Sequence, residues 1–336
     1  MSRLYVLGVV LAILALPAKA SFWDLFLSDE ELIKRDLDLK KAFMVANACE
    51  AAYLSAGETK KMLGSMGVVK YDFIDIEKNG DTQVLIASTT NYSLICFRGT
   101  QEIADWKTNL MLSGKRISSY TNNGHVHSGF HNAWNSARPN IEEYLDSHQS
   151  SFSKGNNNVE LCHQVLIGGH SLGGALALIA GIEWKDKYGI LGVFTFGQPK
   201  VYSKEAKESY ETYNLFGAPI PLIHRYVFKD DPVPSLPPGY VHIGDEKFSS
   251  KIGSILRSRR EGPYWPSVGD HSMSNYVATL AALMSKVARS NESKAMVKWI
   301  QNKNSPLTDY LDIPERNVET ITHGFTDIRS FTRCKL

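Results

Sequence analysis

Residues 165–177 read VLIGGHSLGGALA, and three successive parts of this stretch each predict a local structure. Residues 165–167 are a short apolar run of the kind found in buried parallel strands. Residues 169–173, GHSLG, match a G-x-S-x-G turn, and the Ala- and Leu-rich residues 172–180 favour a helix. A strand, a tight turn and a helix in this order are the context in which G-x-S-x-G presents a nucleophilic serine.

The glycines of this turn predict how Ser171 is presented. A turn this sharp holds its central residue in a strained backbone conformation and leaves no room for side chains on its neighbours. We therefore expect Ser171 Oγ to stand clear of the sheet, at the positive end of the following helix. The N–H of Leu172 would point towards an oxyanion formed by attack at Ser171. The alternative is a glycine-rich turn in which the serine has no chemical role.

The first twenty residues have the pattern of a secretory signal. Arg3 precedes an apolar run over residues 4–16, which is too short to span a bilayer comfortably, and Ala18-Lys19-Ala20 completes a small-x-small cleavage pattern. We expect cleavage after Ala20 and a secreted protein, periplasmic if the source is bacterial. An uncleaved N-terminal anchor is the alternative. Since no later stretch is long and apolar enough, we expect no transmembrane segment in the mature chain.

Composition and charge indicate a globular chain. The 336 residues are 43% hydrophobic and 21% charged, which allows one large α/β domain or two smaller ones. The 37 basic residues include Arg3 and Lys19, and the first twenty residues contain no acid, so the mature chain has 37 − 2 = 35 basic residues against 35 acidic ones. A formal charge of zero creates no strong field to attract nucleic acid or anionic membranes, and we expect no nucleic-acid partner.

The chain has four cysteines, which in an exported protein are expected to pair in part. Cys96 lies in an apolar run and can equally be a buried thiol. We expect a disulfide between Cys49 and Cys334, which would tie the first helix to the C-terminal tail. The sequence contains no C-x-x-C or H-E-x-x-H spacing, so we expect no metal, and no cofactor is implied.

Strand-like and helix-like segments alternate along the chain. The expected strands are residues 71–76, 83–87, 92–97, 165–167, 193–196 and 222–228, and the expected helices are 28–54, 128–145, 172–180 and 271–287. This alternation predicts an α/β sheet covered by helices, in which catalytic groups gather at the C-terminal ends of strands. Thr100, Ser171 and Asp231 all follow such strands. We expect residues 21–289 to form the catalytic domain and residues 290–336 a C-terminal extension packed on it.

A series of motifs resembles the class 3 lipases, also called fungal-type lipases, in the order found in that family. They are FRGT at 97–100, Trp106, HSGF at 127–130, GHSLGGA at 169–175, FGQP at 196–199, DPVP at 231–234, LPP at 236–238 and DH at 270–271. The resemblance spans about residues 40 to 280. It implies an α/β-hydrolase fold, with a mostly parallel central sheet flanked by helices and a short helical lid.

The resemblance also implies a catalytic triad in the order Ser171, Asp231 and His271. Ser171 would attack an ester carbonyl, His271 would take its proton and later give it to the leaving alcohol, and Asp231 would orient His271. The N–H and hydroxyl of Thr100 would stabilise the oxyanion together with the N–H of Leu172, each donor contributing roughly 3 kcal/mol.

Two of these assignments have rivals in the sequence. Asp230 is adjacent to Asp231, but the acid of the family directly precedes a Pro-Val-Pro or Ile-Val-Pro element, which favours Asp231. His170 and His242 are alternatives to His271. His170 lies inside the turn, where packing is the simpler role, and His242 lies in a strand-like run. His271 begins a helix after Gly-Asp, as the base of the family does.

In the family, the segment after the oxyanion residue is a mobile lid. Ile103, Trp106 and Leu110 share one face of a helical pattern over residues 101–112, and this face could cover a cleft in water and turn outward at a lipid surface. The alternative is a fixed surface helix with its apolar face in the core. Separately, Asn291 lies in a glycosylation sequon, used only if the source makes such glycans.

These features lead to one principal hypothesis for the function. We expect a secreted triacylglycerol lipase or carboxylic ester hydrolase that works through an acyl-enzyme, with a lipid ester at an oil–water or membrane interface as substrate. A phospholipase, galactolipase or feruloyl-type esterase on the same triad is the alternative, because the triad alone does not select the substrate. A non-catalytic lipid-binding protein would not need all three triad residues.

Overall fold

The computed structural model describes residues 29–66, 68, 70–76, 82–88, 92–100, 116–120, 124–152, 164–215, 222–228, 231–246 and 271–287. Several expectations therefore lie outside the described residues. They are the signal sequence with its cleavage after Ala20, the lid residues Ile103, Trp106 and Leu110, and also Cys334, Asn291, Asp230 and the extension 290–336. These stay predictions.

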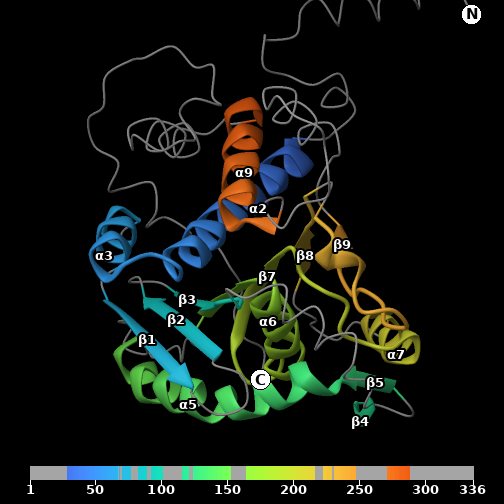
Figure 1. Ribbon diagram of the computed structural model, residues 1–336. Coiled ribbons are helices and arrows are strands. Elements are labelled where there is room, and N and C mark those ends of the chain that lie inside the picture. Colours follow the sequence, from blue (N-terminus) through green and yellow to red (C-terminus); the bar gives the residue numbers. More distant parts are fainter. Residues whose placement is uncertain are drawn as a thin grey trace, which may run out of the picture. The chain divides into compact units, whose positions relative to one another are not determined.

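The larger part of the described chain contains a seven-stranded sheet with the order β1-β2-β3-β6-β7-β8-β9 (Figure 1). Its strands are β1 (Lys70–Ile76), β2 (Thr82–Ser88), β3 (Ser93–Phe97), β6 (Gln164–His170), β7 (Gly189–Phe196), β8 (Ile223–Tyr226) and β9 (Asp245–Glu246). β1, β2 and β3 pair antiparallel, and all pairs from β3 to β9 are parallel. The prediction of a mostly parallel sheet is confirmed.

The register between β3 and β6 brings two distant loops together. Cys96 lies opposite Gly168 and Phe97 opposite Gly169, so both strands end at the same edge of the sheet. Every residue of β3 is buried, as expected for a strand covered on both faces. Gly99 and Thr100 therefore leave the sheet beside the turn that carries Ser171.

Helices from the middle of the chain cover one face of the sheet. α6 (Leu172–Glu183) packs against β3, β6 and β7, and α5 (Ser128–Phe152) packs against α6. Trp134 of α5 lies at the centre of this core and makes edge-to-face contacts with Phe97 and Trp184. α7 (Lys204–Leu215) contacts β5 (Gly124–His127), which pairs with β4 (Arg116–Tyr120) in a separate two-stranded sheet.

The N-terminal helical region differs from the expectation of one helix over residues 28–54. α2 (Asp29–Ala51) is followed by a turn and then by a second helix, α3 (Ala56–Ser65). Glu58 Oε2 accepts hydrogen bonds from both the N–H and the hydroxyl of Ser55, a local signal that begins α3. The predicted C-terminal helix is confirmed as α9 (Met273–Val287).

Contacts between Cα atoms divide the chain into two units. The described part of the larger unit is residues 44–277, and that of the smaller unit is residues 29–43 and 278–287. The boundaries predicted after residues 20 and 289 fall outside the described residues. None of the helices described is both long and apolar enough to cross a bilayer.

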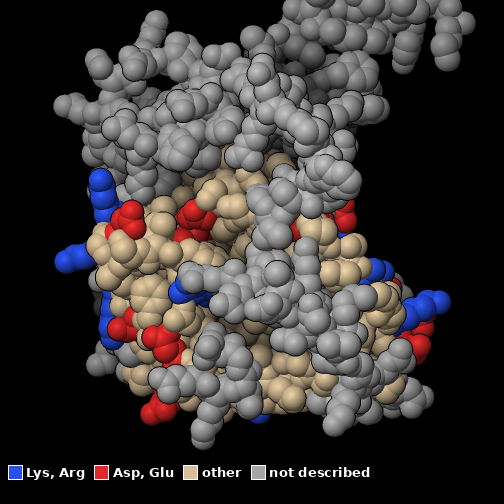
Figure 2. Space-filling view, viewed as in Figure 1, with Lys and Arg blue, Asp and Glu red and all other residues tan. Residues whose placement is uncertain are grey.

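Side chains of both charge signs occur on the face drawn in Figure 2. On α7, lysine and glutamate side chains one helical turn apart form ion pairs. Lys204 Nζ is 3.6 Å from Glu208 Oε1, and Lys207 Nζ is 3.5 Å from Glu211 Oε1. Exposed pairs of this kind contribute only about 0.3–0.5 kcal/mol each.

Candidate active site

Ser171 occupies the tight turn between β6 and α6, as predicted from the sequence. Its φ is 58° and its ψ −126°, and it is the single non-glycine residue of the described chain with positive φ. Such a conformation costs about 1–3 kcal/mol. A Cβ at Gly169 would lie 2.1 Å from the carbonyl oxygen of Gly173, and one at Gly173 would lie 2.0 Å from that of Phe97. The glycines therefore allow the backbone to close around Ser171.

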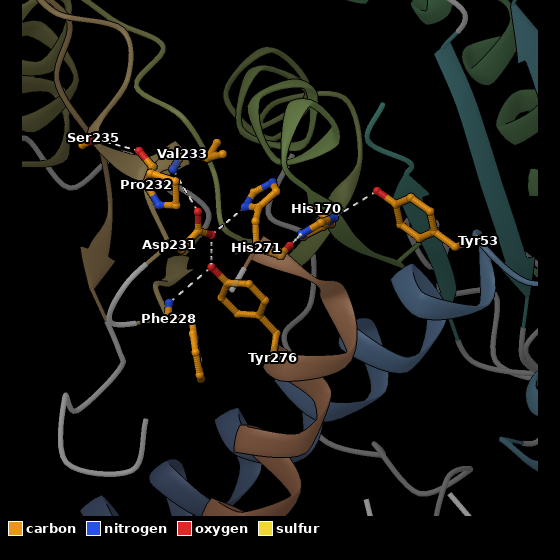
Figure 3. Close-up of polar contacts among 9 residues, drawn as sticks. All are labelled: Tyr53, His170, Phe228, Asp231, Pro232, Val233, Ser235, His271 and Tyr276. Carbon is orange, nitrogen blue, oxygen red and sulfur yellow. Dashed lines mark hydrogen bonds and ion pairs between the residues drawn. The ribbon is translucent and has the colours of Figure 1, made fainter. Parts of the chain in front are cut away.

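Asp231 and His271 form a buried pair at the end of β8 (Figure 3). His271 Nδ1 is 2.6 Å from Asp231 Oδ2, and neither side chain is exposed to solvent. The other oxygen of Asp231 accepts the N–H of Val233 at 2.9 Å. Because Nδ1 donates to the carboxylate, a neutral His271 carries its lone pair on Nε2. This Nε2 atom is buried and has no hydrogen-bond partner in the described chain.

Tyr276, in the first turns of α9, completes the surroundings of the carboxylate. Its hydroxyl donates a hydrogen bond to Asp231 Oδ2 and accepts the N–H of Phe228 at 3.2 Å (Figure 3). The sequence predicts Tyr276 only as part of the apolar face of a helix. No local signal distinguishes a tyrosine whose ring packs in the core from one whose hydroxyl also reaches a buried acid.

The candidate oxyanion residue Thr100 follows β3 on the loop beside Ser171. A Cβ at the preceding residue, Gly99, would lie 2.9 Å from Ser171 Cβ and 2.7 Å from the carbonyl oxygen of His170, so the two loops are in contact. Thr100 Oγ1 is buried without a hydrogen-bond partner in the described chain. Leu172 is the first residue of α6, where backbone N–H groups lack intrahelical acceptors. Thr100 and Leu172 thus offer donors next to Ser171.

The two rival histidines have different partners. His170 Nε2 is 2.7 Å from the carbonyl oxygen of His271, and its Nδ1 is 3.0 Å from the hydroxyl of Tyr53. Burial, followed by repulsion from His271, holds the pKa of His170 well below its usual value. His242 Nε2 is 2.8 Å from the carbonyl oxygen of Pro234, and burial lowers its pKa to about 4. Neither is paired with Asp231, whereas His271 is.

The structure joins some of the predicted site residues and not others. Asp231 and His271 share a hydrogen bond, and the Gly99–Thr100 loop touches the Ser171 turn. His271 Nε2 does not hydrogen-bond to Ser171 Oγ in this structure. A catalytic hydrogen bond of this kind often forms only with substrate bound, so its absence does not remove His271 as a candidate base.

The expected bridge between Cys49 and Cys334 stays a prediction, because Cys334 lies outside the described residues. Cys49 is a free, buried thiol, and so is Cys96. Cys49 lies on the side of α2 that faces the sheet, where its sulfur would be 3.1 Å from a Cβ at Gly168. Burial, followed by a hydrogen bond with the side chain of Cys96, raises the pKa of Cys49 well above its usual value.

The mostly parallel sheet, the strained serine between β6 and α6 and the buried Asp–His pair after a strand are features of the α/β-hydrolase fold. Residues 94–241 match the family described as "Lipase (class 3)", a segment that includes Thr100, Ser171 and Asp231 and ends before His271. This part of the chain is therefore similar to the class 3 lipases, as its motifs indicated.

Individual relatives resemble only part of the chain. It is 28% identical over 156 residues to "Secreted mono- and diacylglycerol lipase 1" of Fusarium solani, covering 46% of this chain and 42% of that protein. It is 33% identical over 141 residues to "Lipase A" of Sodiomyces alcalophilus, covering 38% and 31% respectively. The chain thus spans less than half the length of these curated relatives.

A solved lipase structure from Rhizopus microsporus var. chinensis has a similar fold. The TM-score is 0.50 at 22% sequence identity, over 62% of this chain and 74% of that one. This likeness supports the α/β-hydrolase fold.

Proposed function

We propose that the protein is an exported serine ester hydrolase of the triacylglycerol-lipase type, with Ser171 as nucleophile, His271 as general base and Asp231 as its orienting acid. One observation carries the proposal. His271 is held through Nδ1 by a buried carboxylate, while its Nε2 atom is buried and unpartnered. Burying a polar atom without a hydrogen-bond partner costs free energy. A role in taking the proton of Ser171 during attack on the substrate explains why His271 Nε2 is left without a partner.

The geometry supports a two-step mechanism. Ser171 Oγ attacks the ester carbonyl while His271 Nε2 takes its proton, and the carbonyl oxygen becomes an oxyanion. Collapse of this intermediate breaks the bond to the alcohol, which leaves with the proton from His271, and an acyl-enzyme remains. Water then attacks the acyl group, gives a proton to His271, and the acid leaves as Ser171 regains its proton. Asp231 stabilises the imidazolium in both steps.

The donors for the oxyanion in this proposal are the N–H of Leu172 and the N–H and hydroxyl of Thr100. The buried, unpartnered Thr100 Oγ1 supports this role, because an oxyanion in the site would give it an acceptor. Removing one such donor lowers kcat by about 10²–10³-fold.

For the substrate, we propose a neutral acylglycerol at an oil–water or membrane interface. The family and the acylglycerol lipase from Fusarium solani support this class. Ile103, Trp106 and Leu110 would cover the site in water and turn outward at the interface. Residues 1–20 would direct export and be removed.

The experiment compares the mature protein, Ser171→Ala and the control Ser147→Ala, an exposed serine on α5. A fluorophosphonate should label the first and third proteins and not the second. The hydrolysis panel holds a short soluble ester, an emulsified triacylglycerol and a phosphatidylcholine, each below and above its solubility limit. Material collected from the medium should begin at Ser21.

We expect triacylglycerol turnover to rise once an interface forms, and Ser171→Ala to lower it by at least about 1,000-fold. Cleavage of only the soluble ester or only the phospholipid would keep the triad and overturn the substrate. Failure of the folded protein to label, with detergent present, would overturn the enzyme and leave a lipid-binding protein.

A further inference from the structure

Tyr53, in the turn after α2, reaches from outside the sheet to two of the loops that form the site. Its hydroxyl oxygen accepts the backbone N–H of Gly99 at 2.7 Å. The same oxygen lies 3.0 Å from His170 Nδ1 (Figure 3). The guanidinium of Arg98 stands over the ring of Tyr53, 5.0 Å from its centroid. A residue before the sheet thus contacts the loop that follows β3 and the turn that follows β6.

The partners of His170 fix the direction of each hydrogen bond in this group. The carbonyl oxygen of His271, 2.7 Å from His170 Nε2, can only accept, so Nε2 carries the proton. In a neutral His170 the Nδ1 atom is then an acceptor, and the hydroxyl of Tyr53 donates to it. The same hydroxyl oxygen accepts from Gly99, so one continuous chain runs from Gly99 through Tyr53 and His170 to His271.

Burial keeps the side chains of His170 and Tyr53 neutral. It lowers the pKa of His170 well below its usual value, with further lowering by His271, and it raises the pKa of Tyr53 above its usual range. The rings of His170 and His271 are tilted by 31° relative to each other, and their centroids are 4.5 Å apart. A neutral His170 beside His271 does not repel the imidazolium that would form there during catalysis.

The two ends of this hydrogen-bonded chain, Gly99 and His271, belong to parts of the site whose separation must stay fixed. Gly99 precedes Thr100, the candidate oxyanion donor, and the carbonyl of His271 belongs to the backbone of the candidate base. Between them lies His170, the neighbour of Ser171. A Cβ at Gly99 would be 2.7 Å from the Tyr53 hydroxyl, so no atom separates these groups.

We propose that Tyr53 and His170 are positioning residues that hold the Gly99–Thr100 loop and the backbone of His271 in register with Ser171. The proposal rests on the proposed hydrolase function and adds two residues to it. Neither residue touches the reacting atoms. Their effect is on geometry, since a displacement of about 1 Å at a catalytic group can cost about 10²-fold in rate.

The test compares Tyr53→Phe with the matched control Tyr92→Phe. Tyr92 is 1% exposed, and its hydroxyl points to Met44 Sδ at 3.6 Å, so this variant also removes a buried phenol hydroxyl. With a short soluble ester, Tyr53→Phe should lower kcat between about 10- and 100-fold and leave KM within about two-fold. The affinity for a boronic acid that forms a tetrahedral adduct should fall by a similar factor. Tyr92→Phe should change neither.

Substitutions of His170 give a second, independent measurement. Gln offers one N–H donor and one carbonyl acceptor, so His170→Gln should retain more of kcat than His170→Leu, although both remove the imidazole. Urea unfolding reports the stability of every variant, so a loss of folding is separated from a loss of geometry.

Each outcome of the test separates the two proposals. An active wild type with kcat and boronate affinity unchanged in Tyr53→Phe, or equal activities of the two His170 variants, overturns the positioning role alone. A folded wild type that neither hydrolyses esters nor labels at Ser171 overturns the hydrolase and this proposal with it.

Discussion

At the scale of single residues, the carboxylate of Asp231 is held by three donors: His271, Tyr276 and the N–H of Val233. Tyr276→Phe removes one of them and leaves the N–H of Phe228 without its acceptor. A hydrogen bond to a charged group contributes about 1.5–3 kcal/mol, so we expect kcat/KM for a soluble ester to fall by roughly ten-fold or more. Steady-state kinetics with the purified variant measures this loss.

The control for this variant is Tyr188→Phe. Tyr188 also donates to a carboxylate, Asp146 Oδ1 at 2.9 Å, but at the start of β7, away from the candidate site. Its kcat/KM should be unchanged, and an equal loss in both variants would show that Tyr276 acts through stability alone. Sequence could identify Asp231, because the Pro-rich element after it is a local pattern. It could not identify Tyr276 or Tyr53, whose roles depend on hydroxyl contacts with residues distant in sequence.

At the scale of elements, the turn after β7 decides how closely Asp231 and His271 can approach the sheet. Gly197 has a φ of +59°, and a Cβ there would lie 2.6 Å from Asp231 Oδ2 and 2.7 Å from His271 Cε1. Gly197→Ala should therefore displace the pair and lower kcat by about 10²-fold or more. Gly64→Ala in α3, where nothing lies within 4 Å, should keep full activity and be slightly more stable. A Gly197→Ala enzyme with normal kcat would contradict this account of the turn.

Strands, helices and the serine turn could be predicted because their signals are local. The apolar runs of β3 and β6, the glycines around Ser171 and the spacing in α9 each lie within a few residues of one another. The second helix, α3, was missed although Ser55 and Glu58 form a capping box at its start, because its sequence, AGETKKMLGS, has few apolar residues to mark a helical face. The pairing of β3 with β6 joins segments about 70 residues apart, and no local pattern specifies it.

At the scale of the whole molecule, stability depends on contacts between segments that lie far apart in the sequence. The core of the larger unit joins α5, α6 and the sheet, and Trp134 sits among side chains from all three. It is fully buried, between Phe97 of β3 and Trp184 after α6. Trp134 thus connects layers that are far apart in the sequence, so its removal should destabilise the whole folded unit rather than one element.

We therefore expect Trp134→Ala to lower the free energy of unfolding by about 3–5 kcal/mol, through lost burial and the cavity left behind. The control is Phe73→Ala on β1, whose side chain is 40% exposed; a site of this kind changes stability by about 0.5 kcal/mol or less. Urea unfolding followed by far-ultraviolet circular dichroism measures both variants. Because the ring contacts of Trp134 are with Phe97 and Trp184, the folded fraction of Trp134→Ala should keep its kcat, so activity and the folded signal should disappear together as urea rises. Similar losses of stability in the two variants would mean that Trp134 does not connect these layers.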